Sequence, residues 1–106
     1  MFFGKKVTGP AEWLLVCLGN YGKQYENTRH NIGFMAAERL IDKRALRCNR
    51  LRFRALTELI EFGGARVLLM MPQTYMNLSG EAVGEAARFY KIPSDHVLVI
   101  YDDVSL

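Results

Sequence analysis

A histidine, two asparagines and a pair of aspartates are the residues of this chain whose types and spacing fit chemistry. Asn20 and His30 follow one apolar segment, Asn77 follows a second, and Asp102 and Asp103 follow a third. A histidine with an ordinary pKa of about 6.5 accepts a proton near neutral pH, and a neighbouring carboxylate can fix its tautomer. Asparagine amides bind a carbonyl, a water or a nucleotide without adding charge. Together these groups fit general-base catalysis.

The elements that must position these residues are strands and helices in alternation. Continuous apolar runs at Trp13–Leu18 and Val97–Tyr101 predict strands that are covered on both faces. From Phe53 onward apolar and polar residues partly alternate, as in a strand. Gly63-Gly64 indicates a hairpin turn, and Val67–Met71 is then the return strand.

Two amphipathic helices are expected, each with apolar residues at helical spacing. The first presents Phe34, Ala37, Leu40 and Ile41 and begins at a cap provided by Thr28 or Asn31. The second presents Val83, Ala86, Ala87 and Tyr90, with Asn77 or Ser79 as its N-cap and Pro93 beyond its end.

The order β-α-β-β-α-β predicts a single α/β domain with a mixed, mostly parallel sheet flanked by helices. Helical crossovers make strands 1, 3 and 4 parallel, and strand 2 pairs antiparallel with strand 3. Ligands of such sheets bind beyond the carboxyl ends of the strands, where the five polar residues converge. We expect a short tail over residues 1–12 and a domain over 13–106, which looks incomplete because two helices give little cover.

Each of these residues also has a structural interpretation when it is taken alone. His30 can be a solvated residue near a helix start, Asn20 a turn residue, and Asn77 an N-cap. The aspartates can form a solvated turn. Tyr25 and Met76, which lie beside the candidate groups, can serve packing only. The functional interpretation therefore depends on the convergence of these residues at one edge of the sheet.

Composition narrows the class of protein. The formal net charge is +3, from 14 basic and 11 acidic residues, which permits a polyanionic partner without requiring one. Cys17 and Cys48 form neither a disulfide framework nor a metal motif, so we expect no metal and no cofactor. No apolar run approaches the roughly 20 residues of a membrane span, and we expect a cytoplasmic protein, with an organelle as the alternative.

Three segments resemble the bacterial-type peptidyl-tRNA hydrolase family. They are Leu18-Gly-Asn-Tyr-Gly22 followed by Tyr25 and Thr28-Arg-His-Asn-Ile-Gly33, then Pro72-Gln-Thr-Tyr-Met-Asn-Leu-Ser-Gly80, and finally Val99-Ile-Tyr-Asp-Asp103. The order and spacing match from Trp13 to Leu106. Tyr21 stands where the family usually has Pro. Family members also continue past Leu106 into a segment with a further active-site Asn and basic residues that hold the tRNA.

The resemblance implies hydrolysis of the ester that joins a peptide to tRNA, in a reaction that recycles tRNA. We expect the chain to act as a monomer. His30 matches the catalytic histidine and Asp102, rather than Asp103, matches its acidic partner. Asn20 and Asn77 match substrate-binding residues, and Tyr25 and Met76 match residues that line the site. The alternatives are a non-catalytic RNA-binding relative and an inactive truncated isoform.

A run of six basic residues without an acidic one extends from Lys43 to Arg54. With tRNA as the implied partner, this run is a candidate for phosphate contacts. The alternative interpretation is a solvated basic face.

Overall fold

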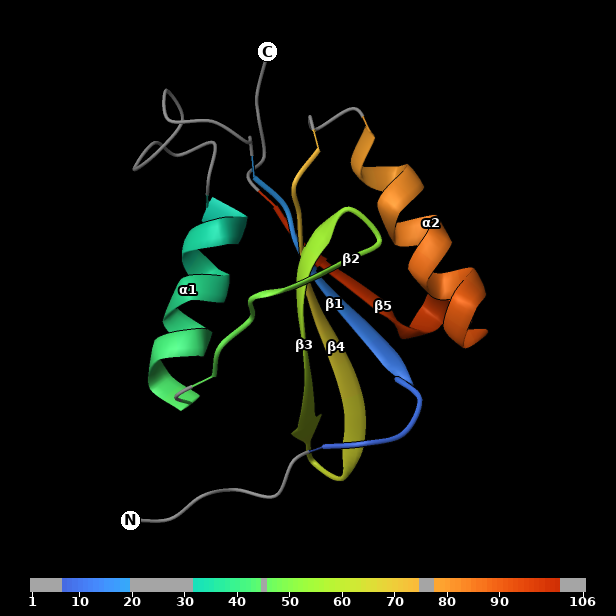
Figure 1. Cartoon of the computed structure of the whole chain (residues 1–106), viewed down its shortest axis with the longest axis horizontal. Helices are drawn as coiled ribbons and strands as arrows, with labels where there is room; N and C mark the ends of the chain where they lie inside the picture. The colour runs from blue at the N-terminus through green and yellow to red at the C-terminus, as the bar shows by residue number, and fades with distance from the viewer. Residues whose placement is uncertain (1–6, 20–31, 45, 75–77, 102–106) are drawn as a thin grey trace.

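The computed structural model describes residues 7–19, 32–44, 46–74 and 78–101 and shows a sheet between two helices (Figure 1). The strands are β1 (Trp13–Cys17), β2 (Arg50–Arg52), β3 (Ala55–Phe62), β4 (Ala65–Pro72) and β5 (Val97–Ile100). The helices are α1 (Ile32–Arg44), α2 (Ser79–Tyr90) and the short 3-10 helix η4 (Ser94–His96). The expected element order is confirmed, and β2 is an additional short strand.

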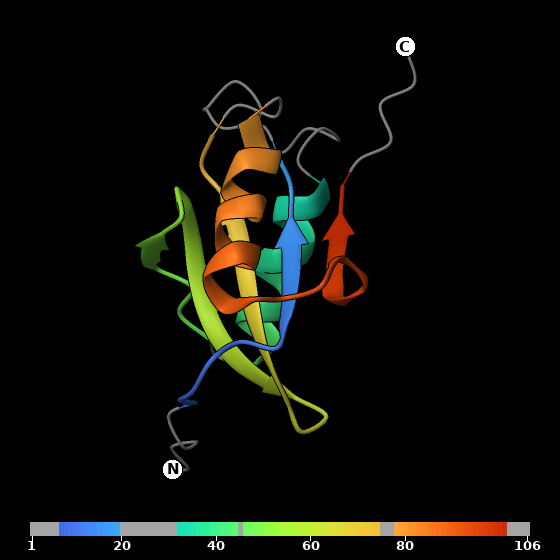
Figure 2. The ribbon, with the colours of Figure 1, turned by 90° about the vertical axis from the view of Figure 1, so that its right-hand side faces the viewer.

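The sheet has five strands in the order β2-β3-β4-β1-β5. β1 pairs in parallel with both β4 and β5, while β3 pairs antiparallel with β4 and with β2. The predicted mixture of parallel and antiparallel strands is therefore confirmed. Figure 2 shows β1 and β5 pointing toward the same end of the molecule.

The hairpin between β3 and β4 turns at the predicted glycines. Gly63 and Gly64 have φ values of 59° and 85°, so both adopt the left-handed conformation that glycine tolerates best. Two such residues in succession match the right-handed twist of the flanking strands. Phe62 and Ala65 pair across the turn, which fixes the register of the whole hairpin.

The sheet is covered by one helix on each face, as alternation of side chains along the strands requires. Leu14 and Val16 of β1 pack with Ala86 of α2 in one core. Cys17 packs with Ala37 of α1 in the other. The apolar positions that predicted each helix are the ones that face these two cores.

The predicted N-cap of α2 is wrong in one respect. Ser79 is the first helical residue, and Leu78 occupies the N-cap position without a side-chain capping bond. The other predicted candidates, Thr28, Asn31 and Asn77, lie outside the described residues. At the opposite end of α2, Lys91 adopts the left-handed conformation and its N–H group donates to the last turn.

The segment before β1 packs against the start of β4. Ala11 is buried, and the N–H group of Glu12 donates to the carbonyl of Arg66 at 2.8 Å. The guanidinium of Arg66 donates to the carbonyl of Pro10 and lies 3.8 Å from the Glu12 carboxylate. These contacts fix the chain direction in which β1 enters the sheet.

Candidate active site at the carboxyl ends of the strands

Every residue that the sequence proposed for the site lies outside the described part of the chain. They are Asn20, Tyr25, His30, Met76, Asn77 and Asp102. The structure does describe their chain neighbours, which are Gly19 after β1, Thr74 after β4 and Tyr101 after β5. We call these three residues, with Leu18 and Gln73, the carboxyl rim. The geometry of the rim shows what the fold brings to this edge.

The three parallel strands end at the same level. Cys17 is the partner of Ile100 in the register of β1 and β5, and Val16 is the partner of Met70 in β4. Beyond the strand, the N–H group of Leu18 donates to the carbonyl of Ile100 at 2.9 Å. The chain therefore leaves β1, β4 and β5 at one edge of the sheet, which is where α/β proteins bind ligands.

Helix α1 begins in direct contact with this edge. A Cβ atom at Gly33 would lie 2.6 Å from the carbonyl oxygen of Ile100 and would overlap the backbone carbonyl of Leu18. Only glycine permits this approach of the helix to the strand ends. Both helices begin at the rim end of the sheet (Figure 1), so the positive ends of their dipoles lie on that side.

An apolar hollow of about 510 Å³ lies beside the rim, between α2, β1 and β5. Leu18, Val99 and Ser79 contribute to its lining. The hydroxyl groups of Thr74 and Ser79 are buried without a hydrogen-bond partner in the described structure. Sequence reasoning gave Thr74 no role and treated Ser79 only as a helix-start residue, because hydroxyl burial leaves no signal in a sequence pattern.

The remaining titratable groups of chemical interest are the two buried thiols. Burial raises the pKa of the Cys17 thiol to about 11. Burial, with a smaller contribution from the charge of Glu58, raises the pKa of Cys48 to about 12. Thiols with such pKa values are not nucleophiles at neutral pH. Within the described ranges no three His, Cys, Asp or Glu side chains gather as metal ligands.

His96 is held at the opposite end of β5. Its ring stacks on Trp13 with centroids 3.9 Å apart, and its Nδ1 atom lies 3.0 Å from the carbonyl oxygen of Glu12. These contacts precede β5, whereas the rim follows it. The second histidine of the chain therefore has a packing role, which leaves His30 as the candidate base.

The comparisons with known proteins agree with this architecture. The profile of the family described as peptidyl-tRNA hydrolase matches residues 14–106. The peptidyl-tRNA hydrolase of Caldanaerobacter subterraneus is 49% identical over 94 residues, which cover 89% of this chain and 51% of that protein. The chloroplastic peptidyl-tRNA hydrolase of Arabidopsis thaliana is also 49% identical, over 89% of this chain and 33% of its own length.

A solved structure shares the fold. The peptidyl-tRNA hydrolase of Acinetobacter baumannii superposes with a TM-score of 0.79 at 34% identity, covering 94% of this chain and 52% of that one. The structure therefore defines the class of protein as an α/β domain whose parallel strands end at one rim. The chain belongs to the peptidyl-tRNA hydrolase family. It spans about half the length of the bacterial relatives that it matches.

Proposed function

We propose that this chain hydrolyses the ester bond between the peptide and the tRNA of peptidyl-tRNA, and thereby recycles tRNA. The observation that carries the proposal is the meeting of β1, β4, β5 and the start of α1 at one rim. The residues that match the family's catalytic and substrate-binding positions follow β1, β4 and β5 in the sequence.

His30 is the proposed general base. It precedes Gly33 by three residues, and three residues span at most about 11 Å, so the contact of Gly33 with the rim limits how far His30 can lie from it. A position just before α1 exposes the imidazole to the positive end of the helix dipole, which disfavours imidazolium. His30 then stays neutral and able to accept a proton near neutral pH.

The proposed reaction proceeds by direct attack of water. His30 takes a proton from the water as its oxygen bonds to the ester carbonyl carbon, and a tetrahedral intermediate forms. The bond from that carbon to the ribose oxygen then breaks, and the proton passes from His30 to the ribose oxygen. The products are a free tRNA 3′ end and a peptide carboxyl group. Asp102 fixes the tautomer of His30 and stabilises its charged form.

Asn20 and Asn77 are the proposed substrate-binding residues, because an amide can hold the ester carbonyl or the terminal nucleotide without a charge. Tyr25 and Met76 line the site in this proposal. The partner is tRNA and the chain acts as a monomer. The expected compartment is the cytoplasm, with a translating organelle as the alternative, since one relative is named as chloroplastic.

A second candidate function is RNA binding without hydrolysis. The observation that favours it is the share of the relatives covered, which is 51% for the Caldanaerobacter protein. In relatives about twice as long as this chain, part of the catalytic machinery can lie in the half that this sequence does not match.

The test is release of free tRNA from an N-acetylated aminoacyl-tRNA by the 106-residue chain, whose folded state is checked by circular dichroism. Release above the rate in buffer supports hydrolysis. Saturable tRNA binding by a folded chain that releases no tRNA would overturn hydrolysis and favour the binding function.

A further inference from the structure

The structure divides the basic run between Lys43 and Arg54 into separate surfaces. Lys43 and Arg44 end α1, where the Arg44 guanidinium lies 4.7 Å from the centroid of the Phe62 ring. Arg54 lies 3.6 Å from the carboxylates of Glu81 and Glu85. Arg44 and Arg54 therefore have partners, and Lys43 and Arg47 lie outside β2. Arg50 and Arg52 form a distinct pair on that strand.

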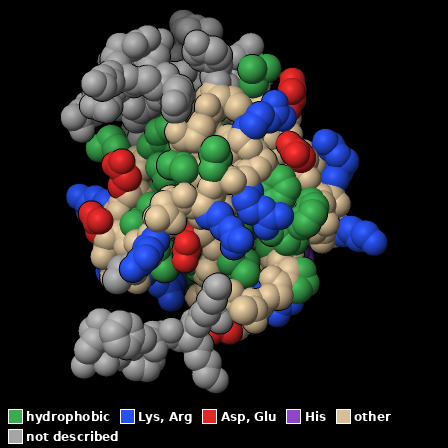
Figure 3. Space-filling model, viewed as in Figure 1, with side chains coloured by type: hydrophobic (Ala, Val, Ile, Leu, Met, Phe, Trp, Pro, Cys, Tyr) green, Lys and Arg blue, Asp and Glu red, His purple; other side chains and the backbone are tan. Residues whose placement is uncertain are grey.

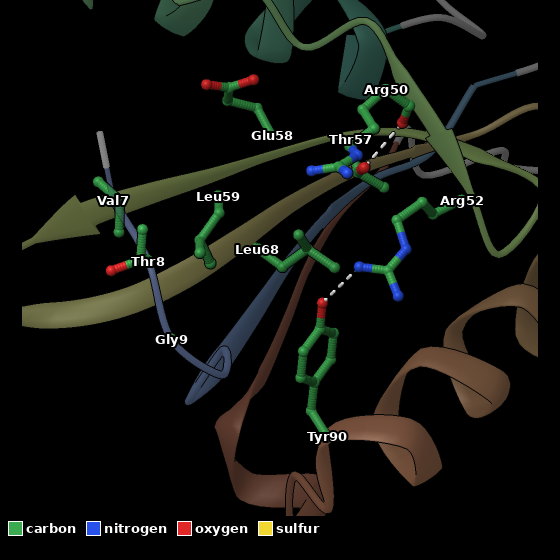
Figure 4. Close-up of a pocket in the computed structure, with 10 residues that line it drawn as sticks. All are labelled: Val7, Thr8, Gly9, Arg50, Arg52, Thr57, Glu58, Leu59, Leu68 and Tyr90. Atoms are coloured by element: carbon green, nitrogen blue, oxygen red, sulfur yellow. Dashed lines mark hydrogen bonds between the residues drawn. The ribbon is translucent and has the colours of Figure 1, made fainter.

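Arg50 and Arg52 lie on the same face of β2, because side chains alternate along a strand. Their partners in the register are Thr57 and Ala55 of β3. A hollow of about 360 Å³ lies at this face, between β2, β3 and the last residue of α2, Tyr90 (Figure 4). In Figure 3 Lys and Arg side chains gather near the centre of the face, where Figure 1 draws β2 and β3.

Arg52 is held in place before any ligand arrives. Its Nη1 atom donates to the Tyr90 hydroxyl at 3.0 Å. Its guanidinium carbon lies 4.8 Å from the centroid of the Phe53 ring and 5.1 Å from that of Phe89. A guanidinium has five N–H donors, so the bond to Tyr90 leaves donors for an anion. Preorganisation of this kind lowers the entropy lost on binding.

Neither arginine of this pair has an acidic partner in the described part of the chain. The ion pairs there join Arg54 and Arg66 to glutamates, and not Arg50 or Arg52. Glu58 contributes to the lining, but it follows Thr57 and so leaves β3 on the other face. Figure 4 shows its carboxylate directed away from Arg52 and Tyr90. Among the described residues, the hollow therefore carries two arginines that form no ion pair with Glu58, the acidic residue of its lining.

We propose that this hollow, which we call the Arg50–Arg52 pocket, binds a backbone phosphate of the RNA substrate at a distance from the rim. Guanidinium groups match the geometry of phosphate oxygens. The exposed ring of Phe89, 60% accessible, lies beside Arg52 and offers a surface on which a base can stack. The inference rests on the proposed function, because it takes tRNA as the ligand.

A single ligand that reaches both the rim and the pocket must be long. Ser79 begins α2 on the rim side and Tyr90 ends it at the pocket. Eleven helical steps of about 1.5 Å separate these residues by about 17 Å along the helix. A terminal nucleotide bound at the rim cannot span this distance, whereas an RNA stem bound there extends well beyond it. A polynucleotide is therefore the phosphate source that the geometry favours.

The experiment measures tRNA affinity at a series of KCl concentrations by fluorescence anisotropy. Replacing a phosphate-binding arginine lowers the slope of log affinity against log salt by about 0.7–0.9. We expect this loss for Arg50→Gln and again for Arg52→Gln, while Arg52→Lys keeps the charge and restores the slope. Arg39→Gln removes the same charge from an exposed position on α1, across the sheet, and should leave the slope unchanged.

The outcomes separate this pocket from the hydrolytic proposal. The proposed phosphate site is wrong if the salt slope is unchanged in Arg50→Gln, or if it falls equally in Arg39→Gln. This holds even where the wild type releases tRNA. If the wild type releases no tRNA but Arg50→Gln still lowers the salt slope, the result supports the pocket and rules out hydrolysis. Absence of tRNA binding, with inorganic phosphate shifting the amide resonances of Arg52 and Tyr90, would identify a free-phosphate site and overturn the RNA assignment.

Discussion

The first turn of α1 rests on the end of β5 through Gly33 and Ile100: a Cβ atom at position 33 would lie 2.6 Å from the Ile100 carbonyl oxygen. Because Ile100 also accepts the N–H bond of Leu18, one carbonyl joins the helix start to the ends of two strands. The placement of the start of α1 therefore depends on the absence of a side chain at position 33.

Gly33→Ala should destabilise the chain. The added methyl group meets backbone atoms of Leu18 and Ile100, which cannot move aside as a flexible side chain can. Overpacking of this kind typically costs about 1–3 kcal/mol. Urea unfolding followed by circular dichroism measures the change.

Gly80→Ala is the matched control, because Gly80 also lies in the first turn of a helix and a Cβ atom there would have no neighbour within 4 Å. Alanine there should be neutral or stabilise the helix by up to about 1 kcal/mol. Equal unfolding midpoints for the two variants would contradict the close approach of α1 to the strand ends.

The two cysteines should react slowly in the folded chain. Burial raises the pKa of Cys17 to about 11 and, with the charge of Glu58 adding to it, that of Cys48 to about 12. At pH 8 little thiolate is present at either site. Labelling by a chromogenic disulfide reagent should be slow in buffer and rapid for both thiols in urea. Rapid native labelling of either thiol would show that it is accessible.

Alkaline pH should reduce stability through the same thiols. Their folded pKa values lie above the ordinary 9.0, so the unfolded chain loses these protons first as pH rises. The contribution is full below pH 9 and is lost between pH 9 and about 11 for Cys17 and about 12 for Cys48. The fall of the urea midpoint above pH 9 should be smaller in Cys17→Ala, and an identical fall would argue against a buried thiol.

Leu98→Lys should reduce non-specific association of the monomeric chain at high protein concentration. β5 is an edge strand in the described sheet, and Leu98 is 53% exposed within a wholly apolar strand. A lysine on an edge strand opposes pairing with a second sheet. Light scattering at increasing concentration should show a clear decrease.

Leu51→Lys provides the comparison, because Leu51 is 66% exposed on β2 at the other edge and already lies between two arginines. A lysine there should change the scattering little. Equal effects at both edges would indicate that net charge, and not the apolar edge of β5, controls association.

The sequence predicted the parts of the fold that depend on local pattern. The apolar run of β1, the glycines of the hairpin and the apolar positions of α1 and α2 were sufficient for element order and strand direction. β2 was not predicted, because three residues are too few for an alternating pattern to stand out. It exists because Thr57 donates to the Arg50 carbonyl and because Phe53 and Arg54 turn the chain with positive φ.

For the candidate site too, the sequence predicted some features and not others. Convergence at the carboxyl ends of β1, β4 and β5 followed from topology, and the structure confirms the strand ends. The individual roles of His30 and Asp102 came from the family resemblance and stay predictions. The Arg50–Arg52 pocket could not be predicted, because Tyr90 and Arg52 are 38 positions apart and meet only through tertiary packing.

The proposed activation of water by His30 can be tested directly, because the chain has two histidines. The measurement is the rate of tRNA release from N-acetylated aminoacyl-tRNA by the wild type, His30→Ala and His96→Gln. We expect His30→Ala to lose about 10²- to 10⁴-fold in rate. His96→Gln, which affects the stacking on Trp13, should retain most of the wild-type rate. Unchanged release in His30→Ala, or equal losses in both variants, would contradict the claim.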